Sequence, residues 1–535
     1  IWGINFDLPQ VYTTEEYKVV NYALKMGSTK DLNPHFFNYP SLYLYFTLFV
    51  SGLYFAIGKF LGVFNSARDF AYSFIKDPTP IYLIMRLFSV LWSTGASIMV
   101  YLIGKEIFNK RIGFIASLMF VFVPSILVSS HEIRPNMPSL FFVLLSFYFI
   151  YKFYKTGENR YLFFSSVSAG IAISIFYNAI MLILLLPVVY FFRYKQLKLF
   201  NGKLWLSLFL IFIFFIIGTP FAILDYKSFI HDFFAHSHGA LINIPNGILG
   251  VIKNFIFVGS EFSKTPFLGI LCFIGTFFIL FERELENFIL LFGIILFSIP
   301  VMMYHAPGIG YMFPAFPFFI LAGAKLVDKL LQTKYKTLTF LIYFGCLIPT
   351  IKECIYLDYL YTLKDNRTTA KEWIEKNIPF GSKILIDMYP HSPPLKETKE
   401  QLERLYKRAV ELNHYKKEYL KFQLDVHPGG NYGYEIYRIL RLPEEVSGTV
   451  ELVKEAQKVQ DLVDISNDGF SILKNKGIDY IILNSKDRES ALNSKYEFLK
   501  NFYKLVPEKC KLIKKFPEEK IKFQKGPEIF IYKIL

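Results

Sequence analysis

Residues 41–64 read SLYLYFTLFVSGLYFAIGKFLGVF, a run made almost entirely of apolar and aromatic residues. A run of this length can cross a bilayer as a helix or lie along the membrane surface. Ten further apolar runs follow, at 82–103, 112–130, 137–151, 161–176, 178–192, 204–222, 266–281, 287–303, 311–328 and 337–353. The sequence therefore predicts a polytopic α-helical membrane protein with about ten or more spans.

The apolar runs end near residue 355, and the composition then changes to one rich in lysine and glutamate. Residues 367–387 have the pattern of an amphipathic helix, a Pro-Gly turn and a buried strand at 383–387. The pattern recurs with a second strand at 480–483, and the chain ends on the strand-like EIFIYKIL. We expect a soluble α/β domain over 356–535, with 395–422 forming a solvated charged helix.

Lysine and arginine are concentrated in alternate loops of the apolar region, near residues 105–111, 152–160, 193–203 and 329–336. The intervening loops, 131–136, 177, 223–265 and 304–310, contain few of these charges, so the basic set is assigned to the cytoplasm. This also explains the net charge of +15 without a nucleic-acid partner. The protein is expected in the plasma membrane, with the C-terminal domain outside.

Residues 1–40 are polar and contain the stretch VYTTEEYKVVNYALKM, in which Glu15 and Glu16 are adjacent. The pair is suited to supplying a base at a membrane surface, but it is also typical of a helix start capped by Thr13 or Thr14. If 41–64 lies along the membrane surface, this first loop is outside with the other charge-poor loops. If 41–64 spans, the glutamates move to the opposite face. We adopt the surface interpretation.

Three other features of the sequence bear on the fold or on chemistry. The runs 161–176 and 178–192 meet at Tyr177-Asn178, which predicts a tight hairpin or a broken helix. The four cysteines are scattered and predict neither a zinc site nor a disulfide framework. The chain starts at Ile1 rather than Met, and we expect a membrane helix to precede it in the full protein.

The turn HEIRPN, residues 131–136, follows the second long run and contains Glu132 and Arg134. Polar groups beside a span are costly and need a reason, either a functional role or a mutual ion pair at a helix end. A second polar cluster, HDFFAHSH, lies in the 223–265 loop. Its histidines could chelate zinc or manganese, although such residues more often line a loop; the candidates are His231, His236 and His238.

Several of these motifs occur in one order and on one side of the membrane. They are the acidic pair, a YPSLY element at Tyr39, RLFSVL at Arg86, HEIRPNMPSLFF at His131, PFAILDYKSF at Pro220 and YMFPAFPFFILAGA at Tyr311. The series resembles the GT-C glycosyltransferases. Within them it is similar to the superfamily of dolichyl-phosphate-mannose protein mannosyltransferases and aminoarabinose transferases. The C-terminal domain resembles the soluble domain of many prokaryotic members.

The resemblance implies transfer of a sugar from a polyprenyl-phosphate donor to a protein, lipid or glycan acceptor on the outer face. Glu15 takes the position of the family's aspartate base, and Glu16 follows it. Asn136, with Glu132 nearby, stands where an aspartate is usual, and Asp225 and Tyr311 lie in the matching central loop and late span. Phe176 and Gly310 replace two cations, so Arg134, His131 and His305 are the candidates for binding the donor phosphate.

The chemistry of such a donor fits this assignment. A glycosyl phosphate already has a good leaving group, so the enzyme needs a carboxylate base for the acceptor hydroxyl and donors for the departing phosphate. A single displacement with one base inverts the anomeric carbon, and no metal or other cofactor is required.

Two alternatives compete with this interpretation. One is another GT-C enzyme, an oligosaccharyltransferase or a lipid-sugar polymer transferase. An oligosaccharyltransferase would have a WWDYG-type motif, whereas the nearest segment here is GGNYGY at 429–434. The other is a non-enzymatic transporter of lipid-linked sugars, which predicts internal repeats and charged residues at midspan.

Overall fold

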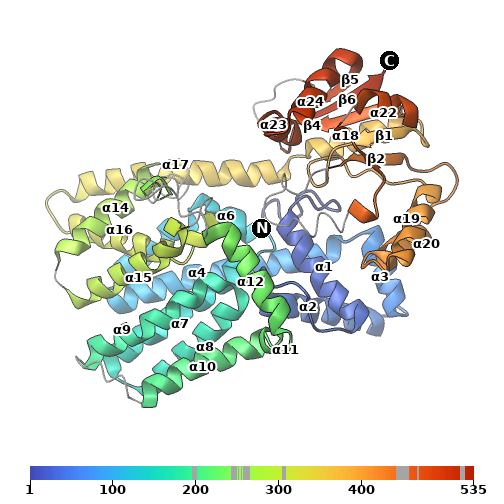
Figure 1. Ribbon diagram of the computed structural model, residues 1–535. Coiled ribbons are helices and arrows are strands. Elements are labelled where there is room, and N and C mark those ends of the chain that lie inside the picture. The colour runs from blue at the N-terminus through green and yellow to red at the C-terminus, as the bar shows by residue number, and fades with distance from the viewer. Residues whose placement is uncertain are drawn as a thin grey trace. The chain divides into compact units, whose positions relative to one another are not determined.

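The structure is a computed structural model of the 535-residue chain. It describes residues 1–194, 202–241, 250, 252–254, 256, 266–282, 284–303, 309–440, 457–466, 469–518 and 525–535. The chain forms two compact units (Figure 1). The first contains Ile1, Glu15–Tyr54 and Tyr82–Asp358, and the second contains Trp2–Thr14, Phe55–Ile81 and Tyr359–Leu535.

The secondary-structure elements in the described residues of the first unit are all helices. Its helices are α1 (Thr14–Thr29), α2 (Leu42–Phe60), α4 (Thr79–Ile107), α5 (Lys110–Val121), α6 (Pro124–His131), α7 (Asn136–Thr156), α8 (Asn159–Ile175), η1 (Tyr177–Met181), α9 (Leu182–Tyr194), α10 (Gly202–Gly218), α11 (Phe221–Leu224), α12 (Tyr226–Leu241), α14 (Pro266–Phe281), α15 (Leu285–Met303), η2 (Ile309–Met312), α16 (Phe316–Leu331) and α17 (Lys336–Thr362). Each of the ten apolar runs lies largely within one helix or one pair of consecutive helices.

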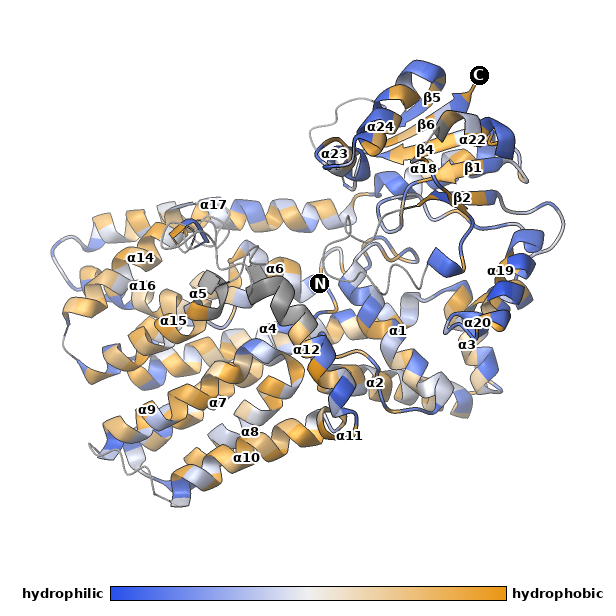
Figure 2. Cartoon of the chain, in the orientation of Figure 1, coloured by the Kyte–Doolittle hydropathy of each residue, from blue (hydrophilic) through white to orange (hydrophobic). Residues whose placement is uncertain are grey.

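By length and composition, five described helical segments can cross a membrane, or six if the bent pair α5 and α6 is one span. The expected number of ten or more crossings therefore stays a prediction. Helix α2 is one of the five, so the surface position assigned to residues 41–64 also stays a prediction. Large hydrophobic side chains such as Phe209, Phe277 and Phe281 are exposed, which is what lipid contact requires. Figure 2 shows α7, α10 and α14 in mostly hydrophobic colours.

Two of the apolar runs are interrupted. The run at 112–130 is bent by 65° between α5 and α6, because the chain leaves the helix at Phe122 and starts again with Pro124 at the first helical position. The expected break near Tyr177 is present: α8 ends at Ile175, Phe176 is extended, and η1 leads into α9.

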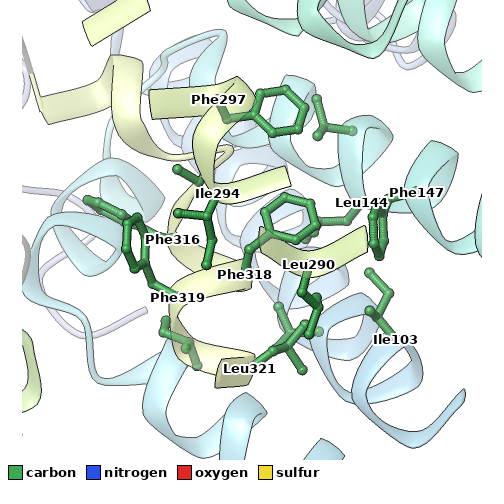
Figure 3. Packing of buried hydrophobic residues seen from close by; sticks show 14 of the residues in the cluster. Ile103, Leu144, Phe147, Leu290, Ile294, Phe297, Phe316, Phe318, Phe319 and Leu321 are labelled. Carbon is green, nitrogen blue, oxygen red and sulfur yellow. The ribbon is translucent and has the colours of Figure 1, made fainter. Parts of the chain in front are cut away.

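The core of the first unit is aromatic and aliphatic (Figure 3). The ring of Phe318 packs edge-on against Phe147 with 4.7 Å between centroids and stacks on Phe297 at 5.8 Å. Leu144 and Leu290 belong to the same buried cluster. This packing joins α7, α15 and α16 behind the polar loops.

Close approach of two helix pairs depends on glycine. A Cβ added to Gly104 in α4 would lie 2.7 Å from the Cα of Gly113 in α5. A Cβ added to Gly275 in α14 would lie 2.5 Å from the Cα of Gly323 in α16. Both contacts are with backbone, which cannot rotate aside, so these helices pack at a distance that only glycine permits.

The second unit contains a six-stranded sheet of order β3-β2-β1-β4-β6-β5. Its strands are β1 (Lys383–Ile386), β2 (Glu435–Ile439), β3 (Leu462–Val463), β4 (Tyr480–Asn484), β5 (Cys510–Phe516) and β6 (Ile529–Ile534). The first four are parallel, and β6 and β5 are antiparallel additions. Strands β1, β4 and β6 lie where the sequence predicts strands, so the expected C-terminal sheet is present.

Helices cover both faces of this sheet. On one face lies α18 (Asn366–Asn377), and on the other lie α22 (Gly469–Lys476) and α24 (Glu497–Lys509). The other described helices of this unit are α3 (Ala67–Lys76), α19 (Lys399–Glu411), α20 (Lys417–Asp425) and α23 (Ser485–Leu492). Alternate strand residues point to opposite faces, so Ile384 packs with Ile374 of α18, whereas Leu385 packs in the other core with Leu473 of α22. The single helix expected at 395–422 is two helices, because the chain turns between Leu412 and Lys416.

Substitution of Gly104 by alanine tests the close helix contact. The added Cβ meets the Gly113 backbone, and overpacking of this kind costs about 1–3 kcal/mol of unfolding free energy. Gly345→Ala is the matched control, because a Cβ at Gly345 in α17 meets nothing within 4 Å. Thermal unfolding in detergent should show a lower midpoint for Gly104→Ala alone. Equal midpoints in the two variants would contradict the packing described.

Candidate active site

Glu15 and Glu16 lie in the first turn of α1, yet their surroundings differ. The side chain of Glu16 is 0% exposed, whereas 31% of the Glu15 side chain is exposed. Adjacent helical residues point about 100° apart, so one glutamate faces the protein interior and its neighbour does not. The two carboxylates therefore have different roles available to them.

Glu16 is held by a buried, bidentate ion pair with Arg86 of α4. The guanidinium donates from Nε at 2.8 Å and from Nη2 at 2.7 Å, and both side chains are 0% exposed. Glu16 Oε1 also accepts the backbone N–H of Ile133 at 3.0 Å. A buried charge is tolerated only when it is paired and hydrogen-bonded, so Glu16 serves as an anchor that joins α1, α4 and the 131–136 turn.

Glu15 keeps a partly open carboxylate. It accepts hydrogen bonds from Lys18 Nζ at 3.2 Å and from the hydroxyl of Tyr39. The Glu15 carboxylate stays partly accessible to solvent beside these two partners, and the Lys18 side chain is also partly exposed. An accessible, hydrogen-bonded carboxylate on a fixed helix start is the arrangement that a general base requires.

The 131–136 turn contributes a second charged pair, Glu132 with Arg134. Burial raises the pKa of Glu132 above its ordinary value; Arg134 opposes the shift, and the negative charge of Glu16 adds to it. The Arg134 side chain is 35% exposed, so its guanidinium can donate to a further anion while it pairs with Glu132. The Glu132–Arg134 ion pair, which the sequence suggested as an alternative to a functional role, is therefore present. The pair does not prevent Arg134 from also binding phosphate.

His131 is buried and faces protein groups. Its Nδ1 lies 3.0 Å from the carbonyl oxygen of Leu127, and its Nε2 lies 3.5 Å from a carboxylate oxygen of Asp358. These contacts join the end of α6 to α17. His131 has no exposed ring nitrogen that could bind phosphate, so the structure gives no support to its predicted role.

Three aromatic rings extend from the Glu15 carboxylate. Tyr39 reaches Glu15 with its hydroxyl, and its ring lies 6.5 Å from Phe176, centroid to centroid. Phe176 in turn stacks on Tyr311 at 5.6 Å. Such rings offer apolar faces beside polar groups, which is the usual composition of a small-molecule site. Phe176 and Tyr311, both identified from the sequence, are thus linked to Glu15 through the Tyr39 ring.

Asn136 and Gly310 lie against each other. The Asn136 amide donates to the Gly310 carbonyl at 3.2 Å, and a Cβ at Gly310 would lie 2.6 Å from the same amide nitrogen. The position that the resemblance associates with an arginine is therefore closed by Asn136. Asn178 donates to the carbonyl of Tyr311 at 3.2 Å and fixes this segment against η1.

The first loop also contacts Asp225, just before α12, and Asp232 within α12. Asn33 donates to Asp225 at 2.8 Å, and the backbone N–H of Phe37 donates to Asp232 at 3.0 Å. Asp225 therefore fixes the first loop. The hydrogen bond from Asn33 holds the pKa of Asp225 below its ordinary value.

The proposed histidine cluster gains no support from the described residues. His231 is exposed and lies 3.2 Å from Asp232. Within the described ranges, no group of three or more His, Cys, Asp or Glu residues could hold a metal ion. The side chains of His236 and His238 lie outside the described residues, as does His305.

Sequence reasoning did not assign roles to Arg86, Tyr39 or Lys18. Arg86 could have been identified, because an arginine within a long apolar run is costly unless an acidic group pairs with it. Lys18 could have been paired with Glu15 by its i+3 spacing. Tyr39 gives no comparable signal, since its contact with Glu15 joins residues from α1 and from the loop after it.

The fold is similar to that of solved glycosyltransferase-related membrane proteins, described below. Residues 82–221 match the family model of dolichyl-phosphate-mannose-protein mannosyltransferases, so the resemblance expected from the motifs is confirmed. None of the curated proteins compared with the chain matches it in sequence.

Solved structures show the same architecture. ArnT from Cupriavidus metallidurans in the apo state is 12% identical, with a TM-score of 0.52 over 99% of this chain and 95% of that one. The same protein bound to undecaprenyl phosphate is 13% identical, with a TM-score of 0.54 and the same coverage. The archaeal oligosaccharyltransferase AglB from Archaeoglobus fulgidus, in complex with an inhibitory peptide and a dolichol-phosphate, is 12% identical, with a TM-score of 0.50 over 92% of this chain and 69% of AglB.

Arg86→Ala tests the buried anchor. The change leaves Glu16 buried without its partner, and breaking a buried pair in this way costs about 3–5 kcal/mol of unfolding free energy. Arg160→Ala is the control, because Arg160 forms an exposed pair with Glu158 at 2.6 Å and such pairs contribute little. Thermal unfolding should separate the two variants. A wild-type midpoint for Arg86→Ala would show that the pair is not an anchor.

Glu132→Gln tests the raised pKa of Glu132. A carboxyl whose folded-state pKa exceeds its unfolded value destabilises the folded protein once ionised. That cost is absent below the unfolded pKa of about 4.3 and develops as pH rises through the folded pKa. Glu132→Gln should therefore unfold at a higher temperature than wild type at neutral pH, and the difference should vanish near pH 4. A lower midpoint for the variant at neutral pH would contradict this.

Proposed function

We propose that the protein is a membrane glycosyltransferase that moves a sugar from a polyprenyl-phosphate donor to an acceptor on the outer face of the membrane. The observation that carries the proposal is the contrast between the adjacent glutamates: Glu16 is locked by Arg86, and Glu15 is left partly open. The GT-C fold and the family match at residues 82–221 support the reaction class.

In the proposed reaction, Glu15 accepts the proton of the acceptor hydroxyl. The hydroxyl oxygen attacks the anomeric carbon as the bond from that carbon to the phosphate oxygen breaks. The electron pair leaves with polyprenyl phosphate, and the anomeric configuration inverts. No acid is needed to protonate the leaving group, and no metal takes part in the step.

Arg134 is proposed to bind the donor phosphate. The guanidinium is exposed enough to form charge-assisted hydrogen bonds to phosphate oxygens while it stays paired with Glu132. The polyprenyl-phosphate donor is supported by the undecaprenyl phosphate bound to ArnT and the dolichol-phosphate bound to AglB. His305 and His131 stay weaker proposals for the same group.

The sugar and acceptor are proposed to lie beside the aromatic row of Tyr39, Phe176 and Tyr311. The centroids of neighbouring rings lie 5.6 to 6.5 Å apart, and the Tyr39 hydroxyl at one end of the row contacts the Glu15 carboxylate. The outer-face position rests on the alternation of basic and charge-poor loops. Comparison of lipid-linked sugars and envelope glycans in a deletion strain by mass spectrometry identifies the donor sugar and the acceptor class.

Glu15→Gln tests the base. The amide is nearly isosteric but cannot accept the proton, so transfer per folded protein should fall about 100- to 10,000-fold. Glu16→Gln should instead reduce folded yield, with a smaller loss of transfer per folded molecule, because its partner Arg86 is buried. The assay uses lipid-linked sugars extracted from the source membranes. Near-normal turnover by Glu15→Gln would eliminate the assignment.

Arg134→Gln tests the phosphate contact. Loss of a charge-assisted hydrogen bond to phosphate should raise the donor KM about tenfold or more, with a smaller change in kcat. Arg160→Gln, at an exposed ion pair elsewhere in the same unit, is the matched control. An unchanged donor KM in Arg134→Gln would remove Arg134 from the phosphate site.

A further inference from the structure

The second unit has a switch point between β1 and β4. The chain passes from β1 outward to β2 and β3, and then returns to place β4 on the other side of β1. In open sheets of this kind, ligands bind in the crevice outside the carboxyl ends of the strands at the switch point. The groups that occupy this edge therefore indicate what the domain binds.

The inner part of this edge is filled by the protein's own buried polar groups. Asp387, which follows β1, accepts the backbone N–H of Asn484 at 2.9 Å and the hydroxyl of Tyr503. The Asn484 amide also donates to Ser392 at 3.2 Å and to Asp487 at 2.8 Å. Asp387, Ser392 and Asn484 are fully or almost fully buried. The network is self-satisfied and leads outward to the loop that contains Tyr389 and Pro390.

That loop and the start of α18 bind the segment Trp2–Thr14, which belongs to the same compact unit. The Tyr389 hydroxyl donates to the carbonyl of Val11. Tyr12 shares a hydrogen bond of 2.9 Å with Thr368, and the Arg367 guanidinium lies 3.6 Å from the centroid of the Tyr12 ring. Val11 and Tyr12 are both buried.

Arg367 is itself held rigidly. It donates to Asp365 from Nε at 2.7 Å and from Nη2 at 2.6 Å, and to the carbonyl of Pro390 at 2.7 Å. Asp365 also accepts the backbone N–H of Arg367 and caps α18. A preorganised guanidinium over a buried ring is a strong form of the cation–π contact.

A second attachment holds the same segment a few residues earlier. Asp7 pairs with Lys525 at 2.8 Å, and both side chains are mostly buried. Lys525 lies 4.9 Å from the centroid of the Phe6 ring, and its carbonyl accepts the N–H of Asn366 at 3.0 Å. Gly526 has φ of +82°, and a Cβ there would lie 2.4 Å from Asp365. The segment, the 525–526 turn and the start of α18 therefore form one packed set.

We propose that these contacts act as a clamp that positions Glu15, an inference that rests on the proposed function. The clamp is defined as Asp7, Val11 and Tyr12 with Arg367, Thr368, Tyr389 and Lys525. Only Thr13 separates Tyr12 from Thr14, the first residue of α1, so Glu15 stays within about 11 Å of the clamped Cα of Tyr12. The switch-point edge of the sheet thus holds the chain segment that directly precedes α1.

The clamp differs from the other attachment of the early chain to this unit. In α3, Arg68 pairs with Asp425 at 3.0 Å, but 59% of the Arg68 side chain is exposed. Exposed pairs contribute little, whereas the ring of Tyr12 is buried beneath a fixed guanidinium. Arg68 is therefore the matched control: it contacts the same domain, but its own segment does not precede Glu15 directly.

The test compares Tyr12→Ala, Asp7→Asn and Arg68→Ala in the full chain, with transfer from lipid-linked sugars of the source membranes. Both clamp variants should lower kcat about 10- to 100-fold with little change in donor KM, because misplacing a base by about 1 Å has effects of this size. Arg68→Ala should match wild type. In the Glu15→Gln background, Tyr12→Ala should cause no further loss, since it acts through Glu15.

Normal kcat in both clamp variants, or a full additional loss in the Glu15→Gln background, would overturn the clamp. A measurement that does not depend on sugar transfer distinguishes failure of the clamp from failure of the proposed function. Maleimide labelling of Thr13→Cys should be at least about tenfold faster when Tyr12→Ala opens the clamp, as expected for loss of local order. It should not change with Arg68→Ala. Equal labelling rates in both backgrounds would overturn the clamp even if wild type transferred no sugar.

Discussion

The buried ion pair between Glu16 and Arg86 is the interaction on which the site depends. It places two charges at 0% exposure within a helical unit whose other buried side chains are mostly apolar. Such a pair is tolerated because the geometry is bidentate and a third donor, the N–H of Ile133, completes it. One carboxylate thereby fixes the first loop, a membrane helix and the 131–136 turn in relation to one another.

This anchor explains why two chemically identical neighbours can differ in function. Because Glu16 is immobilised, the start of α1 is fixed, and Glu15 is held at a set position without being enclosed. The hydroxyl of Tyr39 orients its carboxylate, and Tyr39 continues into the aromatic row with Phe176 and Tyr311. A base that is oriented before the reaction avoids the cost of being ordered during it. The clamp around Tyr12 would extend the same principle to the chain ahead of α1.

Features set by local pattern were predictable from the sequence. The apolar runs indicated the helices, the helix–strand alternation indicated β1 and β4, and a hairpin or a broken helix was expected at Tyr177-Asn178. Features set by contacts between distant residues were not. Arg86 was visible as a charge in an apolar run, but its partner lies 70 positions away. The bend before Pro124, the closure of Gly310 by Asn136 and the docking of Tyr12 on Arg367 depend on tertiary packing, for which one sequence has no periodic signal.

The central claim is that Glu15 is the base and that Glu16 is its anchor. Chemical rescue tests this claim most directly. Glu15→Ala removes the carboxylate and leaves a space, and added formate can supply a small carboxylate in its place. The account predicts that formate restores transfer in Glu15→Ala in proportion to its concentration, with no effect on Glu16→Ala, whose defect is the unpaired Arg86. Rescue of Glu16→Ala with no rescue of Glu15→Ala would contradict it.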